Sequence, residues 1–132
     1  MKVVLDTNVF NDRRFLEWLI ESPFQPVTSS GVYMEVLYRY ARRKGLLEAK
    51  SKVKAVFESI SLEIMDFDEE SAEIVVQSAL GRWDFSKNAR DYMIGSLAVK
   101  LNAPLVTNNK KHFEWLPEVY TPAEFMEKFG SS

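Results

Sequence analysis

The sequence predicts an α/β domain in which a parallel β-sheet is covered by helices on both faces. Short apolar segments alternate with longer segments that show helical periodicity, and this alternation is typical of βαβ units. The first apolar segment, residues 3–5, is uninterrupted by polar positions, which indicates a strand buried on both faces. With 132 residues, 46% of them hydrophobic, we expect a single domain at residues 1–129 and a frayed tail at residues 130–132.

The first half of the chain alternates from strand to helix and ends with two successive helices. These elements are expected at residues 3–5, 15–22, 26–28, 30–44 and 46–60. The first helix ends near Pro23, because the residue before a proline is pushed out of the α region. The second helix is capped by Ser29 or Ser30 and stopped by Gly45, since serine is a preferred N-cap and glycine is common just after a helix.

The second half of the chain continues the pattern. Here the expected elements are strands at residues 62–65, 104–107 and 119–120, and helices at residues 69–80, 86–101 and from 122 onward. Asp68 is a suitable N-cap for the first of these helices. Thr121 and Glu124 form a capping box with Pro122 at the first helical position. Gly95 lies inside the long helix, where we expect it to allow the close approach of a neighbouring backbone.

The composition excludes several classes of protein. The 17 basic and 19 acidic side chains leave a net charge of −2, so the overall charge does not indicate nucleic-acid binding. The absence of cysteine excludes disulfides and thiolate metal sites and suits a reducing compartment. We find neither a signal peptide nor an apolar stretch near the roughly 20 residues of a membrane span. We therefore expect a soluble cytoplasmic protein.

Three acidic residues stand apart from the solvated majority, because each lies at or near an apolar segment. Asp6 follows the first strand, Glu35 lies early in the second helix, and Asp91 lies early in the helix at residues 86–101. In a right-handed βαβ sheet, helices return antiparallel to the strands. The start of a helix therefore lies near the carboxyl ends of the strands, where ligands bind in open α/β sheets. We expect the three carboxylates to converge at this edge.

A pocket that gathers carboxylates needs a compensating cation, because like charges raise one another's pKa. Oxygen ligands without sulfur suit a hard ion such as Mg²⁺ or Mn²⁺, which can activate water and stabilise charge on a phosphoryl group. This donor set favours phosphodiester chemistry over acyl transfer. Structural interpretations remain open for each acid: Asp6 or Thr7 as a helix cap, Asp91 as a complement to the helix dipole, and Glu35 as a surface residue.

The chain resembles the PIN domain family, and within it the VapC-type toxins of toxin–antitoxin pairs. The resemblance covers essentially the whole chain and is specific through the order and spacing of four motifs: residues 3–8 (Val-Val-Leu-Asp-Thr-Asn), 34–36, 88–98, and 105–109 ahead of Phe113. It implies a Rossmann-like sheet, metal-dependent endoribonuclease activity, dimerisation and neutralisation by an antitoxin. Two alternatives stay open, namely a PIN nuclease of RNA processing without an antitoxin, and a catalytically inactive binding module.

The resemblance also implies roles for individual residues. Asp6, Glu35 and Asp91 match the acidic metal-binding trio, and Asn8 matches the residue that helps to orient the first Asp. Thr107 and Asn109 match the polar pair of the last motif. PIN domains often carry a fourth acid in that motif, but this chain has Asn109 and His112 at the relevant positions. This departure argues against a tightly bound second metal more than against activity.

RNA binding would require positive charge around the acidic site. The basic candidates lie on the second helix and beside the last motif: Arg39, Arg42, Arg43, Lys44, Lys110 and Lys111. Contacts of this kind give affinity for phosphate without sequence specificity. The same residues at a helix end also complement the helix dipole. His112 is expected either to support the acidic site or contact phosphate, or to be an exposed loop residue.

Overall fold

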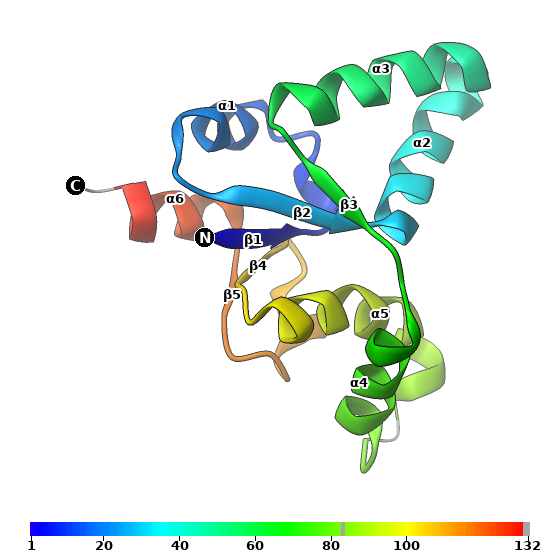
Figure 1. Ribbon diagram of the computed structural model, residues 1–132, viewed down its shortest axis with the longest axis vertical. Coiled ribbons are helices and arrows are strands. Elements are labelled where there is room, and N and C mark those ends of the chain that lie inside the picture. Colours follow the sequence, from blue (N-terminus) through cyan, green and yellow to red (C-terminus); the bar gives the residue numbers. More distant parts are fainter. Residues whose placement is uncertain (83, 131–132) are drawn as a thin grey trace.

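The computed structural model describes residues 1–82 and 84–130. In this part of the chain, five parallel strands form one sheet in the order β3-β2-β1-β4-β5 (Figure 1). The strands are β1 (Lys2–Leu5), β2 (Gln25–Ser29), β3 (Glu63–Met65), β4 (Leu105–Val106) and β5 (Val119–Tyr120). The predicted parallel α/β architecture is confirmed.

Six α-helices flank the sheet in the described residues. They are α1 (Arg13–Glu21), α2 (Ser30–Lys44), α3 (Leu46–Ser59), α4 (Glu69–Ala79), α5 (Phe85–Leu101) and α6 (Pro122–Gly130). Two short 3₁₀ helices, η1 (Thr7–Val9) and η2 (Lys110–Phe113), follow β1 and β4. They were not predicted, because a single turn shows no periodicity. Helix α6 includes Gly130, the first residue of the expected tail, while Ser131 and Ser132 lie outside the described residues.

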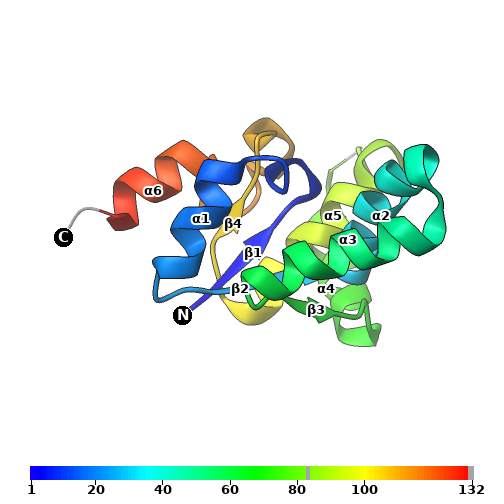
Figure 2. The same ribbon diagram turned by 90° about the horizontal axis from the view of Figure 1, so that it is seen from above.

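The two faces of the sheet bury separate apolar clusters. Alternate residues of β1 point to opposite faces, so Val4 packs with residues of α2, α3 and α5, whereas Val3 and Leu5 pack with residues of α1 and α6. Seen from above, α1 and α6 lie on one side of the strands and α2, α3 and α5 on the other (Figure 2). No helix of the described ranges combines the length and apolar character that crossing a membrane requires.

Several predicted caps are confirmed by side-chain hydrogen bonds. Ser29 accepts from the backbone N–H of Val32, and Asp68 accepts from that of Ser71. In the capping box, Glu124 Oε1 accepts from the backbone of Thr121 at 2.9 Å, while the Thr121 hydroxyl accepts from the backbone of Glu124. These contacts satisfy backbone donors that a helix start would leave unpaired.

Gly95 in α5 faces the indole of Trp115. A Cβ at this position would lie 2.4 Å from Trp115 Cζ2 and 2.6 Å from Cη2. Gly95 therefore allows a close approach, but the expectation of a neighbouring backbone is wrong, because the neighbour is the side chain of Trp115. That indole also packs on Tyr92, with ring centroids 5.0 Å apart. The glycine is required by the position of a large aromatic side chain.

We expect Gly95→Ala to destabilise the fold, because the added methyl group would displace Trp115 from its packed position. Overpacking of this kind costs about 1–3 kcal/mol, which exceeds the gain in helix propensity of about 0.5–1 kcal/mol from replacing glycine by alanine. Chemical denaturation measures the difference. Gly31→Ala in α2 is the matched control, since its Cβ would meet only Ser29 Oγ at 3.6 Å. Equal free energies of unfolding for the two variants would contradict the close packing of Trp115 against Gly95.

Candidate active site

Asp6 lies at the carboxyl end of β1, the central strand, and is 1% exposed. Its Oδ1 accepts a hydrogen bond from the backbone N–H of Thr7 at 2.7 Å, and its Oδ2 accepts from the Thr107 hydroxyl at 2.8 Å. Asp6 is also the N-cap of η1, so the capping interpretation holds for this residue. Capping fixes the carboxylate in place without excluding it from a site, since both oxygens can accept more than one hydrogen bond.

The other two acids come to the same edge from helices. Glu35 lies in the second turn of α2, which starts directly after β2, and its side chain is 29% exposed. Asp91 lies in the second turn of α5 and is only 8% exposed. Both helices begin near the carboxyl ends of the strands, as the βαβ geometry requires. The structure thus brings together all three acids named from the sequence.

A single guanidinium group joins the three carboxylates. The Nε of Arg90 donates to both oxygens of Glu35 at 2.8 Å. Its Nη1 donates to Asp91 Oδ1 at 2.8 Å, and its Nη2 lies 3.2 Å from Asp6 Oδ1. The Nη2 also donates to the Thr7 hydroxyl at 2.9 Å, which in turn lies 3.2 Å from Glu35 Oε1. The structure therefore contains a compensating cation, and the chain itself supplies it.

Arg90 and Thr7 are the site residues that sequence reasoning missed. Arg90 directly precedes Asp91, and adjacent helix positions usually point in different directions. The flexible stem of the arginine nevertheless carries its charge back to the acids. The neighbouring carboxylates raise its pKa even though partial burial acts in the opposite direction. The position of Arg90 directly before the buried Asp91 was the signal in the sequence that could have identified it.

Asp91 has a second basic neighbour in His112, whose Nδ1 lies 3.1 Å from Asp91 Oδ2. The histidine side chain is also 41% exposed, so both expectations for this residue remain open. Burial raises the pKa of Asp91 above its ordinary value, and the charges of Arg90 and His112 only partly offset this effect. A cation bound at this carboxylate would favour its ionised form.

The last motif supports Asp6 through Thr107, which is fully buried. The Thr107 hydroxyl donates to Asp6 and accepts from the backbone N–H of Asn109 at 3.0 Å. Asn8 holds the neighbouring loop, since its Oδ1 accepts from the backbone of Asn108 at 3.0 Å. The Asn8 amide nitrogen lies 3.5 Å from the Thr107 hydroxyl, a long contact. An effect of Asn8 on the orientation of Asp6 would have to pass through Thr107 and stays a prediction.

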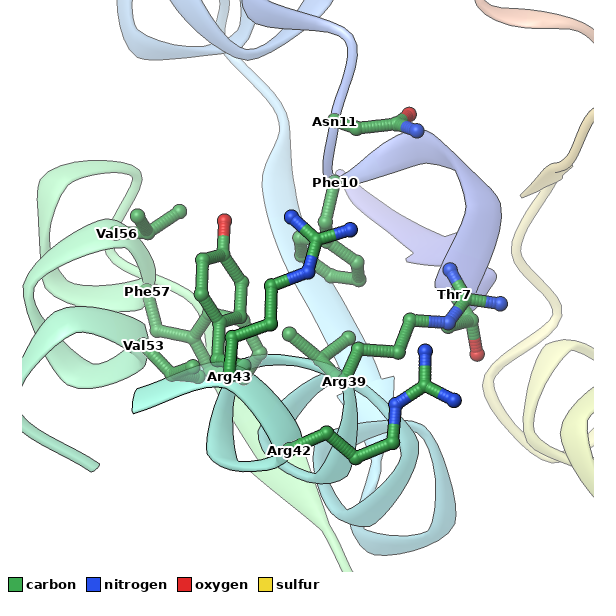
Figure 3. Close-up of a pocket in the computed structure, with 11 residues that line it drawn as sticks. Thr7, Phe10, Asn11, Arg39, Arg42, Arg43, Val53, Val56 and Phe57 are labelled. Carbon is green, nitrogen blue, oxygen red and sulfur yellow. The ribbon is translucent and has the colours of Figure 1, made fainter. Parts of the chain in front are cut away.

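The predicted basic residues lie in different surroundings, and Lys44, the last residue of α2, is exposed. Arg39, Arg42 and Arg43 line a cavity beside Thr7 and Phe10 (Figure 3). Lys110 instead forms an ion pair with Glu124 of α6 at 2.9 Å, so its charge is partly neutralised. Lys111 is exposed on η2. The arginines of α2 are thus the better candidates for contact with an anion near the acids.

The oxygen donors at this edge fit a hard divalent ion in kind and charge. No group of three or more acidic or histidine side chains within the described ranges has the close arrangement of a ready metal site. The guanidinium of Arg90 occupies the point on which the three carboxylates converge. An ion that binds all three acids must displace this guanidinium.

Fold and site together define an all-parallel α/β protein with an acidic cluster at the carboxyl ends of its central strands. The sequence matches the model of the PIN domain over residues 3–118. The chain belongs to the PIN domain family. A search of curated proteins finds no match.

Solved structures with the same fold cover nearly the whole chain. A VapBC2 structure from Rickettsia felis, bound to a DNA fragment from its promoter, has 27% identity and a TM-score of 0.67, covering 91% of this chain and 97% of the other. A toxin–antitoxin complex from Klebsiella pneumoniae has 23% identity and a TM-score of 0.69, covering 91% and 97%. VapBC-1 from nontypeable Haemophilus influenzae has 17% identity and a TM-score of 0.72, covering 93% and 99%. The last two support the fold alone.

Proposed function

We propose that this protein is a metal-dependent endoribonuclease. The observation that carries the proposal is the convergence of Asp6, Glu35 and Asp91 on one cationic group at the edge of the sheet. Two of these carboxylates are almost fully buried, and such charges are expensive to keep unless a cation or several hydrogen bonds compensate them. A fold that places two buried carboxylates and a partly exposed third at one point is suited to bind a cation there.

In this proposal, Asp6, Glu35 and Asp91 hold Mg²⁺ or Mn²⁺. The ion would supply an activated water and stabilise the charge that develops on the phosphoryl group. Thr107 fixes the orientation of Asp6, and the backbone of Asn109 fixes that of Thr107. His112 holds Asp91 from the other side. Residues that lock the ligands in this way matter because they set the geometry of the site before the ion arrives.

We further propose that the protein is the toxin of a VapBC-type pair and acts in the cytoplasm as a homodimer. The R. felis VapBC2 structure supports this assignment at 27% identity over nearly the whole chain. The cysteine-free sequence suits a reducing compartment.

Removal of divalent metal should abolish RNA cleavage. We expect chelation by EDTA to lower the cleavage rate of a labelled single-stranded RNA by at least about 100-fold, the upper range for loss of residues that merely support a metal site. Addition of excess Mn²⁺ or Mg²⁺ to the same sample should restore it. Cleavage that continues unchanged in EDTA would contradict a metal-dependent mechanism. Calorimetric titration without Mg²⁺ or Mn²⁺ uptake would instead identify an inactive binding module.

A further inference from the structure

A cavity of about 360 Å³ adjoins the acidic cluster. It lies between α2, α3 and the segment that follows η1, and its volume falls in the range of about 300–1,000 Å³ typical of small-ligand sites. Its lining combines aromatic and basic side chains, among them Phe10, Tyr40, Arg39, Arg42 and Arg43. Figure 3 shows the three arginine side chains extending from α2 on the side where Thr7 and Phe10 lie.

The basic side of the cavity has no carboxylate partner among the described residues. Within residues 1–82 and 84–130, none of Arg39, Arg42 and Arg43 forms an ion pair with a carboxylate. Arg42 instead lies over the ring of Tyr38, with its guanidinium carbon 5.7 Å from the ring centroid. Three unpaired guanidinium groups at one mouth favour an anionic ligand, and planar guanidinium groups match phosphate in shape.

The apolar side of the cavity provides aromatic surface. The rings of Phe10 and Phe57 lie 5.0 Å apart between centroids with a tilt of 32°. Phe57 is a buried core residue, so the partly exposed rings of Phe10 and Tyr40 provide the accessible surface. A phosphate group alone would not stack on these aromatic rings, which we call the aromatic wall. A flat heterocyclic base would, because bases bind to aromatic side chains by stacking.

The cavity borders the candidate active site at Thr7. Thr7 lines it, and the Thr7 hydroxyl contacts both Glu35 and Arg90. Arg39 lies one helical turn after Glu35 on α2, so the two side chains project from the same face. A ligand in the cavity would therefore lie next to Thr7 and close to Glu35.

We propose that this cavity binds one nucleotide of the RNA next to the scissile phosphodiester. The aromatic wall takes the base, and Arg39, Arg42 and Arg43 take the adjoining phosphate. The inference rests on the proposed nuclease function and deepens it, since a base-binding subsite beside the acidic site determines where the chain is cut. An acidic peptide segment would also be attracted by the arginines, and the test below distinguishes it.

The first arm of the test measures binding of a fluorescein-labelled 12-nucleotide RNA in EDTA, where cleavage is blocked. We expect the double variant Arg39→Gln/Arg43→Gln to bind at least about tenfold more weakly than the wild type, with a salt dependence reduced by about two phosphate contacts. The matched control, Lys50→Gln/Lys54→Gln on the exposed side of α3, should change affinity by less than about threefold. Equal losses for the two variants would overturn the proposal.

The second arm separates base binding from phosphate binding. An RNA with abasic nucleotides keeps its phosphates but has no bases to stack, so the wild type should bind it about tenfold more weakly than the intact RNA. Tyr40→Ala, checked for folding by circular dichroism, should reduce this difference to less than about threefold. A difference that stays unchanged in Tyr40→Ala would overturn the nucleotide assignment.

The third arm uses a short peptide of alternating Glu and Leu as a protein-like probe. We expect it not to compete with RNA. Competition that is lost in Tyr40→Ala, with RNA affinity unchanged, would assign the cavity to a protein segment and overturn the proposal. The parent function is tested separately, because absence of Mn²⁺-dependent cleavage with the RNA binding pattern intact would contradict the nuclease while retaining the nucleotide site.

Discussion

Asp91→Asn is expected to abolish RNA cleavage while leaving the fold intact. The substitution keeps the shape of the side chain but removes a charge that would otherwise hold the divalent ion. Loss of residues that only support a metal ligand typically costs 10–100-fold in metal affinity or activity, so loss of a direct ligand should reduce the cleavage rate by at least about 100-fold. The burial that raises the pKa of Asp91 also makes this charge costly to the fold, and its removal should not destabilise the protein.

The measurement is the cleavage rate at saturating Mn²⁺, together with the free energy of unfolding. Asp66→Asn is the matched control, because Asp66 is exposed between β3 and α4 and should have no effect on the rate. If the Asp91→Asn protein cleaves RNA at a rate within about threefold of the wild type, Asp91 is not a ligand of the metal. A variant that is both inactive and unfolded would show that the fold needs Asp91. That result would contradict the expectation of an intact fold.

Arg90→Gln is expected to have opposite effects on stability and on metal affinity. Without metal, the guanidinium compensates the charges of Asp6, Glu35 and Asp91. Its loss leaves them to repel one another, and we expect a destabilisation of about 1–2 kcal/mol, less than for a fully buried pair because the arginine side chain is 45% exposed. The same loss removes the group with which the ion competes, so Mn²⁺ should bind about tenfold more tightly.

Denaturation with and without Mn²⁺, combined with calorimetric titration of the ion, tests both effects. Lys87→Gln removes one positive charge from an exposed position of the same helix and should change neither quantity appreciably. Weaker Mn²⁺ binding by Arg90→Gln would show that the arginine supports the bound ion. That result would contradict the view that the guanidinium and the metal occupy the same place.

The fold was predictable because its signals are local and repeated. Continuous apolar segments, serine and aspartate caps, and the Gly45 stop between α2 and α3 each point to the same βαβ pattern. The meeting of Asp6, Glu35 and Asp91 also follows from topology, since strand ends and helix starts share one edge of a parallel sheet. These conclusions require chain direction and periodicity, both of which the sequence displays.

The remaining features depend on side-chain reach, which periodicity does not describe. Arg90 is long enough to place its charge among acids that come from two other segments and from its own neighbour. The space beside Gly95 is taken by a tryptophan twenty positions later. The cavity beside Thr7 depends on how α2 packs on α3. Each of these results from tertiary packing of residues that carry no distinctive pattern in the chain.

The central claim is that Asp6, Glu35 and Asp91 bind one divalent ion in the place held by the Arg90 guanidinium. A crystal structure of the protein with Mn²⁺, located by its anomalous scattering, tests it most directly. We predict one Mn²⁺ with oxygen ligands from these three side chains at about 2.0–2.2 Å and the Arg90 guanidinium displaced from Glu35. A saturated crystal in which Mn²⁺ binds elsewhere, with Arg90 still joined to all three acids, would contradict the claim.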